Sequence, residues 1–144
     1  MGGSDAEAMV GYLVKRVQQS LRRRCDAALR PTGLSMAQYA ALRALADHPD
    51  ASASELARLC FVTRQSFQDL LSGLRSAGLV GEGDARSAGR ARPLALTAAG
   101  RRRLATAHTA VAGVEASMLS GLSANAKRQL AQALTACAVN LEED

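Results

Sequence analysis

Apolar residues recur every three or four positions along most of the chain, which is the period of amphipathic helices. The first such run covers about residues 9–29 and ends where Pro31 interrupts it. A second run starts at Ser35 and stops at Pro49, and a third, shorter one opens at Ser52. Both short runs begin with a serine followed three residues later by Gln or Glu, the capping-box spacing that satisfies free amides at a helix start. The pattern predicts one long helix followed by two short ones.

A fourth apolar run, from Arg64 to Ala77, has start and stop signals of its own. Thr63 is placed to cap it, and Gly78 can adopt the left-handed conformation that ends a helix. Two short helices joined by a tight turn are what a helix-turn-helix requires, so the third and fourth runs predict that motif. The apolar face of the fourth helix is expected to consist of Phe67, Leu70, Leu71 and Leu74.

The helical period stops after Gly78. Leu79 and Val80 form one short apolar stretch, and residues 93–96 form another. The segment between them, about residues 81–93, is rich in glycine, alanine and charge. This arrangement predicts two short strands joined by a loop, the wing of a winged helix.

Two helical runs follow the second strand, one from Thr97 to about Met118 and one capped by Ser123. Together with the first helix, they carry apolar stripes too long to bury against a small winged module alone. A symmetric partner is the simplest place for those stripes, so we expect a homodimer. The expected fold is mainly α, of the α+β winged-helix class, in a single domain over residues 1–144. It has a winged helix-turn-helix at about 35–97, with its wing at about 81–93, flanked by dimerisation helices at about 9–31 and 98–142.

The composition suits a core of closely packed helices. Of the 144 residues 48% are hydrophobic, but Phe and Tyr number two each and Trp is absent, so Ala, Leu and Val must fill the core. No apolar run reaches the 18 or so residues that would cross a bilayer, and the first residues lack the basic flank and apolar core of a secretion signal. We therefore expect a soluble cytoplasmic protein with no membrane segment.

Positive charge is concentrated in one part of the chain. The formal net charge is +5, and all but two of the 18 cationic residues are arginine. Residues 62–103 hold eight arginines against three acidic residues, whereas the rest of the chain has ten residues of each sign. A local excess of arginine, unlike a uniform one, indicates a module that binds nucleic acid.

Five fragments along the chain stand in a particular order and spacing. They are Gly33-Leu34-Ser35, Tyr39-Ala40-Ala41-Leu42-Arg43-Ala44-Leu45, Ser54-Glu55-Leu56-Ala57, Leu71-x-x-Leu74-x-x-x-Gly78-Leu79-Val80 and Leu96-Thr97-x-x-Gly100-Arg101. In this order they resemble the MarR family of bacterial transcription regulators over nearly the whole chain. The resemblance implies a homodimeric winged helix-turn-helix repressor that binds a pseudo-palindromic operator in double-stranded DNA and is released by a small ligand or by oxidation.

The chain departs from the family pattern at two places. Asp69 lies on the fourth helix, the recognition helix of the motif, where family members usually have a basic residue. Ala88-Gly89 replaces an Asp-Arg pair that family members have in the wing. An aspartate repels phosphates, but it can accept a hydrogen bond from cytosine N4 or orient a neighbouring arginine. Arg90 matches the second arginine of the wing pattern and is the strongest wing candidate.

Polar side chains occupy the first turns of the fourth helix, off its apolar face, where a helix in the major groove presents base-reading groups. Arginine can form paired hydrogen bonds with guanine and glutamine with adenine, while serine can bond to a base or a phosphate. The alternatives are a solvated helix face and a charged loop without DNA contacts. The expected DNA contacts are Thr63, Arg64, Gln65, Ser66, Gln68, Asp69 and Ser72 on the helix, and Arg86, Arg90 and Arg92 on the wing.

The resemblance also implies an effector pocket between the dimerisation helices and the winged module. An arginine and two tyrosines beside apolar walls would suit a small aromatic or anionic effector such as an aromatic carboxylate. Against this, Tyr39 can be ordinary core, and Arg16 and His108 can lie at the surface or the dimer interface. The expected lining is Tyr12, Arg16, Met36, Tyr39, Arg43, His108 and Val111.

Three cysteines offer a different trigger, a redox-sensing thiol. Cys25 follows Arg22 to Arg24, whose charge would favour the reactive thiolate. Yet Cys25, Cys60 and Cys137 all lie on apolar stripes, where free cysteine usually acts as a small buried hydrophobe.

Catalytic chemistry has no support in the sequence. The two histidines lack a carboxylate or cysteine at ligand spacing, and no Gly-rich loop or nucleophile elbow occurs. We expect no enzyme, metal site or cofactor. A winged-helix module that binds protein in place of DNA is the remaining alternative, and the arginine-rich segment argues against it.

Overall fold

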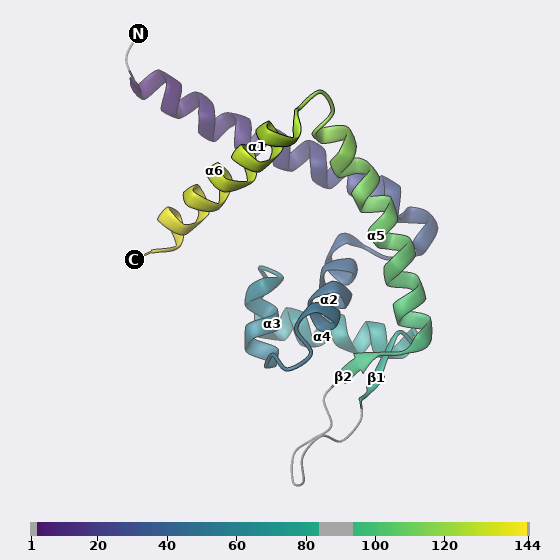
Figure 1. Ribbon diagram of the computed structural model, residues 1–144. Coiled ribbons are helices and arrows are strands. Elements are labelled where there is room, and N and C mark those ends of the chain that lie inside the picture. The colour runs from purple at the N-terminus through teal and green to yellow at the C-terminus, as the bar shows by residue number, and fades with distance from the viewer. Residues whose placement is uncertain (1–2, 84–93, 144) are drawn as a thin grey trace.

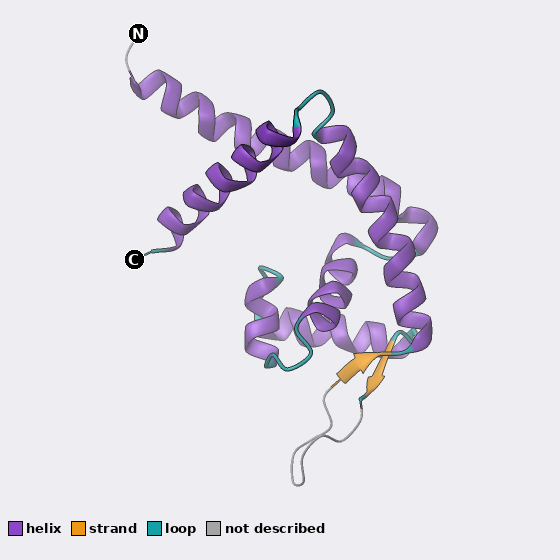
Figure 2. Cartoon of the chain, viewed as in Figure 1, coloured by secondary structure: helices purple, strands orange, loops and turns teal. Residues whose placement is uncertain are grey.

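The computed structural model describes residues 3–83 and 94–143, and shows a mainly helical chain with one small sheet (Figures 1 and 2). The expected fold class is confirmed. In chain order the elements are α1 (Gly3–Leu29), a short 3-10 turn η1 (Arg30–Thr32), α2 (Met36–Asp47), α3 (Ala53–Leu59), α4 (Arg64–Ser76), β1 (Val80–Glu82), β2 (Leu94–Leu96), α5 (Ala98–Met118) and α6 (Ala124–Glu142).

Hydroxyl side chains set the starts of five helices, as predicted. Ser35 Oγ accepts a hydrogen bond from Gln38 N, and Gln38 Oε1 accepts one from Ser35 N, which completes a capping box at α2. Ser52 and Glu55 form the second capping box, at α3. The starts of α4, α5 and α6 are capped by Thr63, Thr97 and Ser123. Only α1 differs, because it begins at Gly3, earlier than the apolar pattern indicated.

The core lies where α2, α4, the sheet and the first half of α5 meet. Phe67 and Leu74 of α4 are fully buried there against Leu42 of α2. The predicted apolar face of α4 is confirmed, with Leu70 partly buried at its edge. On α2 the buried residues include Tyr39, Leu42 and Leu45, whereas Ala46, in the last turn, is exposed and lines a surface groove.

The two strands form an antiparallel pair in which Val80 faces Leu96 and Glu82 faces Leu94. Val80 and Leu96 are buried, whereas Ala95, which points to the opposite face, is exposed, so one side of the small sheet closes the core. Gly78, with a φ of 77°, provides the predicted left-handed stop between α4 and β1. The expected wing loop, with Arg86, Arg90 and Arg92, lies outside the described residues.

The first turn of α5 is joined closely to the chain that leaves α4. Thr97 N donates to the Leu79 carbonyl (3.0 Å), and Thr97 Oγ1 donates to the Gly78 carbonyl (2.7 Å). A Cβ at Gly100 would lie 2.0 Å from the Leu79 carbonyl oxygen. That oxygen belongs to the backbone, so it cannot move aside as a flexible side chain could. Glycine at this position therefore allows α5 to approach the end of α4.

Apolar side chains of the end helices remain exposed in the single chain. No described residue of α6 is buried, and Figure 1 shows α6 running away from the far end of α5. In α1, Cys25 and Leu29 are buried near the C-terminal end, whereas the preceding half of the helix carries exposed apolar residues. The exposed apolar residues of the two helices are Met9, Val10, Tyr12, Leu13, Val14 and Val17 in α1, and Leu130, Leu134, Val139 and Leu141 in α6.

Over the described part of the chain, no helix combines the length and apolar character needed to cross a membrane.

The contact between Gly100 and Leu79 can be tested by thermal or urea unfolding. We expect Gly100→Ala to lower the free energy of unfolding by about 1–3 kcal/mol, because the added methyl overpacks a backbone contact. Gly113→Ala is the matched control in the same helix. A Cβ at Gly113 meets nothing within 4 Å, so alanine should be neutral or stabilise by about 0.5–1 kcal/mol through helix propensity. Equal stabilities for both variants would show that α5 does not approach Leu79 so closely.

Candidate nucleic-acid interface

The start of α4 is a well-defined polar turn. Thr63 Oγ1 accepts a hydrogen bond from Ser66 N (3.0 Å) and donates one to Ser66 Oγ (2.9 Å). This cap fixes the direction in which the helix leaves the turn, and Arg64 follows as the first helical residue. The free amides and positive dipole end of a helix start favour an anionic partner such as a phosphate.

The side chains of α4 divide into a buried face and an exposed polar face. Phe67, Leu71 and Leu74 hold the helix on the core, so the opposite side is free to meet a ligand. All the residues predicted from the sequence to contact DNA from this helix are exposed: Thr63, Arg64, Gln65, Ser66, Gln68, Asp69 and Ser72. Their placement on one accessible surface is what a major-groove helix requires, while contact itself stays a prediction.

Asp69 forms a hydrogen bond within the polar face of α4. Gln65 Nε2 donates to Asp69 Oδ1 over 3.1 Å, one helical turn along. The aspartate thus orients a glutamine, whereas the sequence suggested an arginine as its neighbour. A glutamine amide held from one side presents a defined edge, which is what bidentate recognition of adenine needs.

Two of the three arginines at the start of α5 form bonds within the chain. Arg101 Nη1 donates to the Leu96 carbonyl (3.0 Å), and Arg103 Nη1 donates to the Thr32 carbonyl (2.8 Å). These two side chains are therefore engaged in contacts within the chain. Arg103 instead connects α5 to the turn between α1 and α2.

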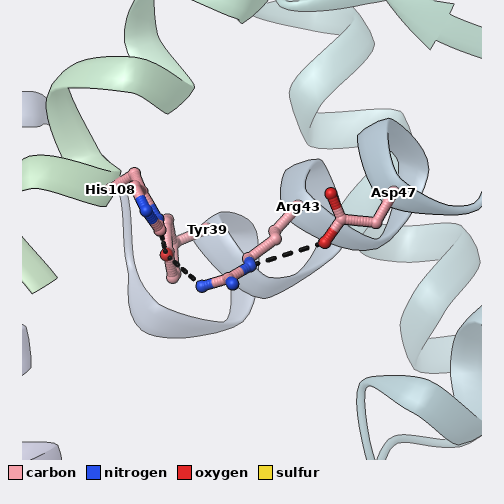
Figure 3. Close-up of polar contacts among 4 residues, drawn as sticks. All are labelled: Tyr39, Arg43, Asp47 and His108. Atoms are coloured by element: carbon pink, nitrogen blue, oxygen red, sulfur yellow. Dashed lines mark hydrogen bonds and ion pairs between the residues drawn. The ribbon is translucent and has the colours of Figure 1, made fainter. Parts of the chain in front are cut away.

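A polar network connects α2 with α5 (Figure 3). The Tyr39 hydroxyl lies 3.1 Å from His108 Nδ1 and accepts a hydrogen bond from Arg43 Nη1 at 3.0 Å. Arg43 Nε also pairs with Asp47 Oδ2 over 3.5 Å. The hydrogen bond to Tyr39, with a smaller effect of Asp47, raises the pKa of Arg43. Tyr39 itself is buried, so the interpretation of this residue as core is confirmed.

Three of the seven residues expected to line an effector pocket lie in two separate grooves of the single chain, and the other four line neither groove. Arg16 lines a groove of about 320 Å³ between α1 and α5, which is large enough for a small ligand. Arg43 and His108 line a different groove, between α2 and α5. Met36 and Val111 pack partly buried against the core, and Tyr12 is exposed on α1. Ligand binding by these residues stays a prediction.

Sequence reasoning missed Arg24 in the groove between α1 and α5. This groove is lined by Leu13, Arg16, Val17, Ser20, Leu21, Arg24, Val114 and Met118. Arg16, Ser20 and Arg24 follow one another at intervals of four, as do Leu13, Val17 and Leu21, and that spacing places residues on one side of a helix. The four-residue interval was the signal that could have identified Arg24.

Cys25 and Cys60 do not have the properties of a sensing thiol. Burial raises the pKa of Cys25, and Asp26 and Glu115 raise it further, whereas Arg24 lowers it by the smallest contribution. Arg24 therefore acts in the expected direction, but burial and the two carboxylates outweigh it, and Cys25 is the buried hydrophobe that its apolar stripe indicated. Burial also raises the pKa of Cys60. Cys137 is exposed in the single chain, against the expectation of a buried hydrophobe.

Within residues 3–83 and 94–143, no three His, Cys, Asp or Glu side chains are grouped so that they could hold a metal ion.

Known proteins are similar to nearly the whole chain. A model of the MarR family matches residues 32–91. The HTH-type transcriptional repressor Rv2887 of Mycobacterium tuberculosis is 38% identical over 134 residues, which cover 93% of this chain and 96% of that protein. The repressor Mb2911 of Mycobacterium bovis matches with the same values.

Solved structures of Rv2887 also share the fold. Its complex with salicylic acid has a TM-score of 0.73 and 37% identity, covering 88% of this chain and 94% of the other. Its complex with DNA has a TM-score of 0.71 and 35% identity, covering 88% and 95%. These matches to Rv2887 cover more of the chain than the family model does, so they include parts of the end helices outside residues 32–91.

Proposed function

Because the chain belongs to the MarR family of transcription regulators, we propose that it is a repressor that binds a pseudo-palindromic DNA operator as a homodimer. The observation that carries the proposal is the exposed polar face of α4, which is capped by Thr63 and held on the core by Phe67. It lies in the part of the chain that holds the whole positive net charge. The related repressor Rv2887 forms a complex with DNA, which supports the same partner here.

In the proposed complex the start of α4 enters the major groove. Arg64 and Gln65 read base edges, and Thr63 and Ser66 face the phosphates near the helix start. Gln68, Asp69 and Ser72 extend the contact along the groove. The wing arginines Arg86, Arg90 and Arg92 would reach the minor groove or its flanking phosphates.

The homodimer is proposed from the uncovered faces of the end helices. In a single chain α6 and the first half of α1 expose a row of apolar side chains, and a symmetric partner would remove that surface from water. Residues 9–31 and 98–142 would then form the dimer, and residues 35–97 would form the DNA-binding module. Two copies of α4 would enter successive major grooves on one face of the duplex. We place this activity in the cytoplasm.

The proposed effector is an aromatic carboxylate. Rv2887 forms complexes with salicylic acid and with p-aminosalicylic acid. In this chain the groove between α1 and α5 offers apolar walls together with Arg16 and Arg24, which are suited to pair with a carboxylate. Tyr12, Met36, Tyr39, Arg43, His108 and Val111 would form the remaining lining only if the dimer brings them to the same ligand. A ligand held between α1 and α5 would favour an arrangement that cannot dock on DNA.

DNA binding can be tested with a duplex that the wild-type protein selects from a random pool. We expect a shifted complex with two chains per duplex, whose affinity falls steeply as salt rises. Arg64→Ala should weaken binding by about 5- to 150-fold, the loss of one base or phosphate contact. Arg128→Ala removes the same charge from α6 and should leave affinity unchanged. Failure to enrich any duplex, or equal losses in both variants, would contradict the proposal.

The effector proposal can be tested by fluorescence anisotropy of the same duplex with added salicylate. Salicylate should weaken DNA binding by about 5- to 150-fold, a typical allosteric coupling. Arg16→Ala should remove most of this effect because the carboxylate loses its partner, and Arg128→Ala should retain it. Salicyl alcohol, which has the ring without the carboxylate, serves as the ligand control. If salicylate weakens DNA binding equally in the wild type and in Arg16→Ala, the effector does not bind in this groove.

A further inference from the structure

The turn between α3 and α4 contains an unusual residue for its backbone conformation. Phe61 N donates to the Arg58 carbonyl (3.1 Å) and Val62 N to the Ala57 carbonyl (3.0 Å), the two hydrogen bonds of a Schellman motif at the end of α3. Phe61 occupies its left-handed position with a φ of 57°. Among the described residues, every other positive φ belongs to a glycine.

Folding gives no reason for a phenylalanine at this position. The left-handed conformation favours glycine or asparagine, because a Cβ meets the following carbonyl oxygen. Packing does not compensate, since the Phe61 side chain is 90% exposed and adds nothing to the core. A residue type that is unfavourable for its backbone conformation and gains nothing from packing is expected where function requires its side chain.

The surroundings of Phe61 indicate the partner. Thr63, the cap of α4, lies two residues further on, and Arg64 follows it. Arg58 stands in the last turn of α3 and is exposed, so arginines lie on both sides of the aromatic ring in sequence. Leu59 adds a second partly exposed apolar side chain. An apolar group between two cations suits a polyanion that also has carbon surfaces, which is the chemistry of DNA.

We propose that Phe61 makes an apolar contact with the operator where α4 enters the major groove. This inference rests on the proposed DNA binding and adds a specificity-determining residue to it. Two carbon surfaces of DNA are available there, the 5-methyl group of thymine and the deoxyribose ring. Contact with a second copy of this turn is disfavoured, because it would bring arginines of like charge together.

The test compares three variants at Phe61 on the duplex selected by the wild-type protein. Phe61→Gly and Phe61→Asn both suit the left-handed backbone, so their melting temperatures should equal or exceed that of the wild type. Both should bind the duplex about tenfold more weakly, because a partly buried aromatic contact is lost. Their salt dependence should stay unchanged, since no phosphate contact is removed. Phe61→Tyr keeps the ring and should retain most of the affinity.

Replacing thymine by deoxyuracil in the duplex identifies the surface that is contacted. If wild-type affinity falls and that of Phe61→Gly does not, the ring contacts a thymine methyl. If both proteins are insensitive to the replacement while Phe61→Gly stays weaker, the ring contacts deoxyribose. Unchanged affinity in Phe61→Gly and Phe61→Asn would overturn the inference, as would loss of self-association as their sole effect. Failure of the wild type to select any duplex would instead refute the underlying DNA-binding proposal.

Discussion

The close approach of Gly100 to the Leu79 carbonyl is the constraint on which the working of this chain depends. Leu79 follows directly on the glycine that ends α4, and Gly100 lies in the first turn of α5. The bonds from Thr97 to Gly78 and Leu79 fix the same junction. Because these are backbone contacts of short range, the long α5 helix cannot rotate at its start without carrying the end of α4 with it. The helix proposed to read DNA is therefore rigidly connected to the helices proposed to form the dimer.

Other contacts extend this connection to the remaining elements. Arg103 joins α5 to the turn after α1, and the Tyr39–His108 pair joins α5 to α2. In contrast, the groove that contains Arg16 lies between α1 and the C-terminal part of α5, whereas the junction with α4 lies at the start of α5. A ligand there would act on the angle between two helices while the junction passes the change to α4. Ligand binding in the groove could thus change the position of α4 on the operator through packed helices alone, because packed elements move as units.

The sequence predicted the features that depend on local chemistry. Serine and threonine caps, the left-handed Gly78 and the apolar face around Phe67 are each determined by a few neighbouring residues, and the structure contains them all. What could not be predicted depends on contacts between distant segments. In the sequence, Gly100 is indistinguishable from any other helical glycine, and only the fold shows that it lies against Leu79. The pKa of Cys25 is raised mainly by burial, which cannot be inferred from the neighbouring arginines. The left-handed Phe61 was missed for a different reason, because the usual signal for that conformation is a glycine.

In the proposed complex, two copies of this chain present two α4 helices to one face of a DNA duplex. Hydroxyl-radical footprinting on a selected operator tests it most directly, because it maps protected sugars at single-nucleotide resolution. We expect two protected patches related by a two-fold axis, with centres about 10 base pairs apart or a multiple of that spacing. A single protected patch without two-fold symmetry, or uniform protection along the duplex, would contradict it.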